Sequence, residues 1–122
     1  MDIEICTVGG YSEIGANMTA VRVGDEVVIF DMGFHIPSII RLQEEETSKT
    51  DLTREQLINA GAVPDDSVIK KWKGKVKAIV LGHCHLDHIG AVPYLAERYK
   101  CPIYGSAYTI EVLKVTTRDD KV

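Results

Sequence analysis

The sequence predicts an α/β (α+β) domain, in which a mixed β-sheet is covered by helices. Two observations predict this class. The chain begins with β-branched segments that alternate in the manner of strands, and its second half follows a β-loop-α-β-α order. With 122 residues, of which 45% are hydrophobic and 26% are charged, the chain has the size and composition of one globular domain.

Three strands are expected in the first part of the chain. Residues Asp2 to Val8 alternate in polarity. The segments Met18 to Val23 and Glu26 to Asp31 are separated by Gly24-Asp25, which indicates a hairpin. Asp31 ends a buried strand, where a carboxylate is costly unless its charge is used, so it is a functional candidate; the alternative is a carboxylate that caps a turn.

The segment between this hairpin and the next strand is mixed in character. Glu44 to Thr50 is polar and predicts a surface loop. Thr53 and Gln56 form a capping-box pair, which predicts a short helix from Arg54 to Ala60. A second helical turn is expected around Ser67 to Trp72.

The second half of the chain alternates strands with helices. Val76 to Leu81 is an apolar run that predicts a buried strand, and Ala91 to Tyr99 has one apolar helical face. Pro102 to Tyr104 is a short strand, and Ser106 is expected to cap a helix that runs to about Val115. A loop between this buried strand and the first of these helices is therefore held between two ordered elements.

That loop carries three imidazoles and one carboxylate within six consecutive positions. These side chains are the ligands that Zn²⁺ prefers. Residues two apart in an extended segment point the same way, so His83 and His85 can bind one ion. A turn at Leu86 can carry Asp87 and His88 to a second ion. The spacing predicts half of a two-metal site, because no histidine follows His88 and two ions require further ligands.

The remaining histidine and the cysteines suggest no second site. Cys84 should alternate away from the two histidines beside it, so we expect a free thiol packed behind the site. His35 is isolated in the sequence and is expected to be an ordinary surface or core residue. With Cys6 and Cys101, the three cysteines are odd in number and widely spaced, which favours reduced thiols over a disulfide framework or a zinc ribbon.

Charge and hydropathy argue against two function classes for these residues alone. The formal net charge of -4 argues against strong nucleic-acid binding by these residues alone. A basic cluster from Lys70 to Lys77 could contact a phosphate backbone, although such a run is more often a solvated face. No apolar run is long enough for a membrane span, and the N-terminus lacks the basic start of a signal peptide, so the expected location is the cytoplasm.

At this point the residues resemble a known family. The His-x-His-x-Asp-His motif after a strand, with an Asp at the end of an earlier strand, looks like the second and first motifs of the metallo-β-lactamase superfamily. A narrower resemblance is to the N-terminal part of ribonuclease J, a β-CASP-type nuclease family of bacteria and archaea. It runs to about Lys114 and is carried by five segments: Gly9 to Met18, Phe30 to Gly33, Gly82 to Gly90, Val92 to Leu95 and Pro102 to Gly105.

The resemblance implies a zinc-dependent RNA hydrolase, with 5′-to-3′ exonuclease activity and an endonuclease activity beside it. By position, His83 and His85 would bind one of two Zn²⁺ ions, and Asp87 and His88 the other. Asp87, His88 and Asp31 would form the catalytic group, with Asp31 orienting the metal loop by hydrogen bonding. An RNA substrate and a homodimeric parent protein are also implied.

Two departures from the family matter. Gly82 stands where the family often has Thr or Ser, so one supporting hydroxyl is missing. The family's remaining ligands, its β-CASP insertion and its C-terminal part lie beyond residue 122. We therefore expect residues 1–122 to be an N-terminal fragment of a metallo-β-lactamase domain, half of an αββα sandwich with a variable excursion at about 34–75. Such a fragment should be inactive alone and self-associate through an exposed sheet face.

Three alternatives remain open. One is a β-CASP endonuclease of the cleavage-and-polyadenylation type, which has a similar layout of motifs. Another is a small-molecule hydrolase of the same fold, such as a lactonase, thioesterase or β-lactamase. The third is a non-catalytic metal-binding fragment, for which stoichiometric zinc binding would be the deciding measurement.

Overall fold

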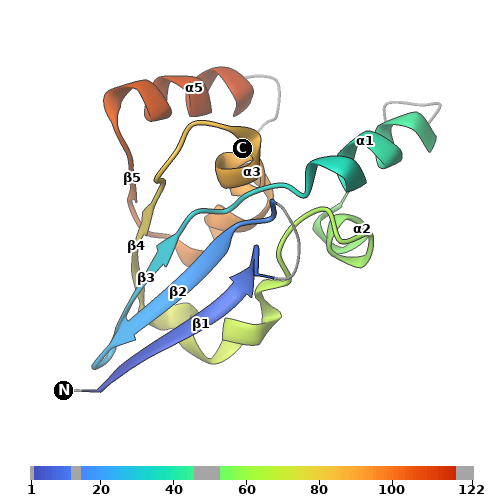
Figure 1. Ribbon diagram of the computed structural model, residues 1–122. Helices are drawn as coiled ribbons and strands as arrows, with labels where there is room; N and C mark the ends of the chain where they lie inside the picture. Colours follow the sequence, from blue (N-terminus) through green and yellow to red (C-terminus); the bar gives the residue numbers. More distant parts are fainter. Residues whose placement is uncertain (1, 12–14, 46–52, 118–122) are drawn as a thin grey trace.

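The sheet has five strands in the order β1-β2-β3-β4-β5 (Figure 1). This computed structural model describes residues 2–11, 15–45 and 53–117. The first three strands are antiparallel neighbours, whereas β3, β4 and β5 run parallel, so the predicted mixed sheet is confirmed. The strands are β1 (Ile3–Gly9), β2 (Met18–Val23), β3 (Glu26–Phe30), β4 (Val76–Val80) and β5 (Ile103–Tyr104).

Short helices follow each of the strands β3, β4 and β5. Thr53 and Gln56 form both hydrogen bonds of the predicted capping box, at 3.1 and 2.8 Å. The last helix begins after Ser106, whose hydroxyl accepts the Thr109 N–H at 3.1 Å. The helices are α1 (Ile36–Glu45), α2 (Arg54–Asn59), the 3₁₀ helix η1 (Asp66–Lys75), α3 (Leu86–Ile89), α4 (Val92–Leu95), the 3₁₀ helix η2 (Ala96–Tyr99) and α5 (Ala107–Thr117).

Three of these elements differ from the sequence prediction. Glu44 and Glu45 belong to α1 rather than to a loop, while the rest of that predicted loop lies outside the described residues. Helix α1 forms because Ile39 and Leu42 pack on the core from one face of it. The turn expected at Leu86 is the start of α3. The single helix expected from Ala91 to Tyr99 is α4 followed by η2, which ends at Lys100 in a left-handed conformation.

The two faces of the sheet differ in burial. Ala20, Val27, Ile29 and Ile79 are fully buried in one cluster with residues of the helices. On the opposite face, the register places Phe30 of β3 next to Val80 and Tyr104 of the following strands. That face is apolar and open, since Ile3, Ile5, Phe30 and Tyr104 expose 63%, 66%, 42% and 55% of their surface.

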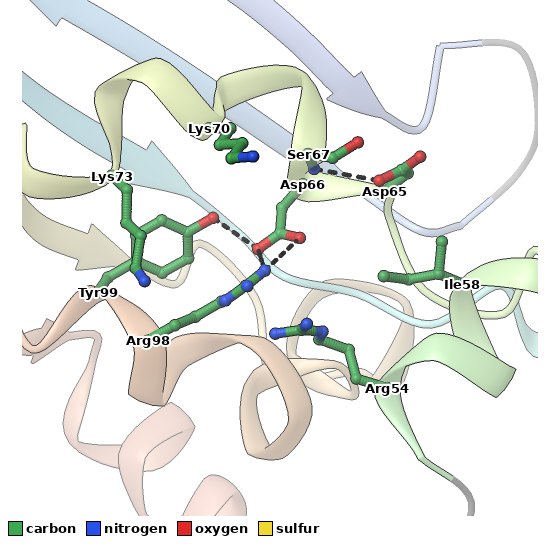
Figure 2. A pocket seen from close by; sticks show the side chains of 9 residues that line it. All are labelled: Arg54, Ile58, Asp65, Asp66, Ser67, Lys70, Lys73, Arg98 and Tyr99. Carbon is green, nitrogen blue, oxygen red and sulfur yellow. Dashed lines mark hydrogen bonds and ion pairs between the residues drawn. The ribbon is translucent and has the colours of Figure 1, made fainter.

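A buried ion pair joins η1 to η2 on the covered side. The side chain of Asp66 is 1% exposed, and Arg98 Nη1 donates to its two oxygens at 3.0 and 3.1 Å. The Tyr99 hydroxyl donates to the same carboxylate at 2.6 Å. Burial, and then the hydrogen bond and charge of Asp66, raise the pKa of Tyr99 far above its usual range. We call Asp66, Arg98 and Tyr99 the Asp66 cluster (Figure 2).

Candidate metal centre

The candidate site lies where two parallel strands end side by side. Phe30 of β3 pairs with Val80 of β4, and the Asp31 N–H donates to the Val80 carbonyl at 2.9 Å. Asp31 and Gly82 therefore leave the sheet at the same edge. The carboxyl ends of parallel strands are where open α/β sheets place their ligand sites.

Asp31 connects the two strand ends through both carboxylate oxygens. Its Oδ1 accepts the Gly82 N–H at 2.8 Å, and its Oδ2 lies 3.0 Å from His88 Nδ1. The residue has φ of 68°, a left-handed conformation in which Asp is enriched among non-glycine residues. A Cβ on Gly82 would lie 3.6 and 3.9 Å from the carboxylate oxygens. A side chain at position 82 would therefore begin beside the Asp31 carboxylate, which the backbone N–H of Gly82 already contacts.

The four candidate ligands are brought together in two pairs. His83 Nε2 lies 2.9 Å from His85 Nδ1, with ring centroids 4.1 Å apart. Asp87 and His88 are neighbours on α3, with 3.7 Å between Asp87 Oδ2 and His88 Nε2. The centroids of the His83 and His88 rings are 5.3 Å apart, which places the two pairs next to each other.

These pairs can be tested against the geometry of zinc. Zinc–nitrogen bonds of about 2.0–2.1 Å in a tetrahedral arrangement place two ligand nitrogens ~3.3 Å apart. The His83 and His85 nitrogens need to separate by only a few tenths of an ångström from 2.9 Å to reach this spacing. Within the described residues, however, no three His, Cys, Asp or Glu side chains form a group that could hold one ion. The donor types and the spacing of the histidine pair fit zinc, and each pair offers two donor side chains.

Backbone hydrogen bonds hold α3 against the segment after β3, which Figure 1 shows passing alongside it. The Met32 and Phe34 N–H groups donate to the His88 and Leu86 carbonyls at 2.9 and 2.8 Å. Gly33 lies between these contacts, and a Cβ there would be 1.6 Å from the Asp87 carbonyl oxygen. The helix that carries Asp87 and His88 is therefore positioned by main-chain contacts that only a glycine permits.

One supporting residue was missed from the sequence. Asn17 Nδ2 donates to the Asp87 carbonyl at 2.8 Å, and its own carbonyl accepts the Gly33 N–H at 3.0 Å. Asn17 thus ties the loop before β2 to both sides of the site. The only sequence signal was an amide side chain at the end of a glycine-rich segment, of which residues 12–14 lie outside the described residues.

Two further residues, Cys84 and His35, belong to neither pair. Cys84 is a half-buried free thiol. His35 is at the start of α1, where its Nδ1 lies 2.6 Å from the Ser38 hydroxyl and its N–H donates to the Ala62 carbonyl at 2.8 Å. These contacts give His35 a role at the start of a helix.

Comparison with known proteins identifies the family. The family model for the metallo-beta-lactamase superfamily matches residues 12–119. The chain belongs to the metallo-β-lactamase superfamily. Membership implies metal ions, usually zinc, at a site of this kind. Within the described part of this metallo-β-lactamase chain, no helix has the length and apolar character needed to cross a membrane.

Among curated relatives, the chain is similar to proteins named ribonuclease J. It is 52% identical to that of Methanocaldococcus jannaschii over 114 residues, covering 93% of this chain and 25% of the relative. For the Pyrococcus abyssi protein the identity is 48% over 113 residues, covering 92% and 24%. Ribonuclease J 2 of Streptococcus pyogenes serotype M3 is 34% identical over 119 residues, covering 98% and 19%. The chain thus spans a quarter or less of the length of these relatives.

Among solved structures, the chain is similar to the short form of human tRNase Z. Its TM-score is 0.47 at 20% sequence identity, with 97% of this chain and 40% of that chain covered.

Proposed function

We propose that this metallo-β-lactamase chain forms part of a zinc-dependent ribonuclease that acts in RNA processing and decay. The proposed activity is 5′-to-3′ exonucleolytic hydrolysis of RNA, with endonucleolytic cleavage as a second mode. The observation that carries the proposal is the placement of two histidine nitrogens 2.9 Å apart beside a helix that presents Asp87 and His88. The similarity to curated ribonuclease J proteins supports RNA as the substrate.

Each residue of the motif has a proposed task. His83 and His85 would hold one zinc ion, and Asp87 and His88 the other. Asp31 binds His88 through Nδ1, which leaves Nε2 to face a metal and favours one orientation of the ring. Bound zinc would supply a hydroxide at neutral pH and stabilise negative charge on the phosphate oxygens.

Further proposals concern the protein to which these residues belong. We infer an N-terminal position for them in a longer metallo-β-lactamase domain, with a β-CASP insertion and the remaining ligands supplied by other residues. The pairs of two donors support this, because a zinc site needs at least three protein ligands. A homodimeric, cytoplasmic protein is proposed, with residues 1–122 inactive on their own.

The test uses the protein that contains this chain and RNA labelled at its 5′ end. Zinc content and cleavage are measured before and after treatment with a chelator, and again after zinc is restored. Chelation should abolish cleavage and zinc should restore it, with mononucleotides released first from the 5′ end. His83→Ala should reduce the zinc content and abolish turnover.

His35→Gln is the matched control, because it also removes an imidazole but lies outside the motif. It should retain zinc and activity. A His83→Ala protein with normal zinc content and normal RNA cleavage would contradict the proposal, as would cleavage that survives complete removal of metal.

A further inference from the structure

A pocket lined by several charged residues lies between η1, α2 and η2. It has a volume of about 280 Å³ and shares no lining residue with the metal loop (Figure 2). Its charged lining residues leave an excess of two positive charges, because four are basic and two are acidic: Arg54, Lys70, Lys73 and Arg98 against Asp65 and Asp66. A concave site with this excess attracts anions.

The two acidic residues are already engaged. Both oxygens of Asp66 accept hydrogen bonds within the Asp66 cluster. Asp65 Oδ1 accepts the Ser67 N–H at 3.1 Å as the cap of η1. Arg98 is therefore neutralised by Asp66, whereas the charges of the other basic residues are not matched by these carboxylates.

Arg54 provides an independent sign of a missing partner. Its Nε atom is buried, and no hydrogen-bond acceptor for it exists among the described residues. Leaving such a donor unsatisfied costs ~1–3 kcal/mol, and more when the group is charged. Figure 2 shows Arg54 extending from α2 toward the place where Arg98 meets Asp66. An acceptor located in the pocket would satisfy this donor.

The two lysines complete the arrangement from the side of η1. Within residues 2–11, 15–45 and 53–117 no ion pair engages Lys70 or Lys73, whereas their neighbour Lys75 lies 3.8 Å from Asp25. These two lysines belong to the basic cluster whose role the sequence left open. Both of them line the pocket and are exposed to solvent.

We propose that this pocket binds a phosphate group. The oxygens of a phosphate group accept hydrogen bonds from an arginine guanidinium and attract the positive charge of lysine ammonium groups. Both kinds of donor line this pocket. The volume of about 280 Å³ lies just below the range for small-molecule sites, ~300–1,000 Å³, and suits a group as small as a phosphate. Either free phosphate or an RNA phosphodiester has this chemistry. The proposal stands whether or not the metal loop hydrolyses RNA.

The experiment measures binding of inorganic phosphate by calorimetry at fixed ionic strength, after metal has been removed with a chelator. Removing metal prevents phosphate from binding at the histidine motif. Arg54→Gln and the double variant Lys70→Gln/Lys73→Gln should each weaken binding by at least ~10-fold, as expected when a charge-assisted hydrogen bond is lost. Lys77→Gln is the matched control, because it removes the same charge at an exposed position outside the pocket.

The outcomes separate the possibilities. Absence of phosphate binding to the unsubstituted protein would overturn the proposal, and so would an equal loss in Lys77→Gln, which would indicate general electrostatics. Far-ultraviolet circular dichroism checks that each variant is folded.

A short single-stranded RNA is then added as competitor. Displacement of phosphate by RNA, weakened in Arg54→Gln, assigns the site to a phosphodiester; phosphate binding that RNA does not affect assigns it to free phosphate.

Discussion

The candidate metal centre and the Asp66 cluster each contain an aspartate, Asp31 or Asp66, whose side chain contacts residues distant in sequence. The two sites differ in what holds them. In the metal loop, main-chain bonds from Met32 and Phe34 fix α3, and the side chains of His83 and His85 are exposed. In the Asp66 cluster the side chains themselves make the contacts, and Asp66 is 1% exposed. In the candidate metal centre, main-chain bonds and the Asp31–His88 contact position α3 and leave the side chains of His83 and His85 exposed, whereas in the Asp66 cluster the side chains themselves join two helices.

The largest effect on stability should come from the cluster. Asp66→Ala leaves the Arg98 charge and the Tyr99 hydroxyl without their partner, which should lower the free energy of unfolding by about 3 kcal/mol. This is the lower end of the range for a broken buried pair, because the Arg98 side chain is 30% exposed and regains some water. Urea denaturation followed by circular dichroism measures the change.

Glu4→Gln is the control for this prediction. It breaks the ion pair with Arg22, in which the Glu4 side chain is 52% exposed, and should cost less than ~1 kcal/mol. Equal losses in the two variants would show that the Asp66 cluster stabilises the fold no more than a surface pair does.

A smaller effect is expected from the glycine that lies against α3. In Gly33→Ala the new Cβ would overlap the Asp87 carbonyl at 1.6 Å, so α3 must move and the cost should be roughly 1–3 kcal/mol. Zinc binding should fall as well, because Asp87 and His88 move with the helix. Thermal unfolding and zinc titration together measure both consequences.

Gly74→Ala is the matched substitution. No atom lies within 4 Å of its added Cβ, and it should be neutral or stabilise by up to ~1 kcal/mol. If Gly33→Ala behaved in the same way, the close contact between the segment after β3 and α3 would not be needed to place the ligands.

The sequence predicted what depends on local pattern. The strands from Met18 to Phe30, the capping box of α2 and the approach of His83 to His85 follow from the spacing of neighbouring residues. Asp31 was found because a carboxylate at the end of a buried strand requires a partner, which proved to be the Gly82 N–H together with His88.

What the sequence did not predict depends on packing between distant segments. Helix α1 begins with no strong capping pattern, and its burial against the core becomes visible only in three dimensions. Asp66 and Arg98 are 32 positions apart, so neither residue signals the other. The pairing of Asn17 with Asp87, over 70 positions, was hidden for the same reason.

The smallest effect on stability should come from the metal loop itself. His83→Ala removes an exposed side chain that lies 2.9 Å from another exposed histidine, His85, so the free energy of unfolding of the metal-free protein should change by no more than ~0.5 kcal/mol. Adding zinc then distinguishes a metal-binding role of His83 from a role in stabilising the fold. A ligand that binds only the folded state stabilises it by about 2.7 kcal/mol at 100 times its dissociation constant, and His83→Ala should lose this gain. Thermal unfolding with and without zinc measures both quantities, and a large loss in the metal-free variant would mean that the loop's side chains stabilise the fold as those of the Asp66 cluster do.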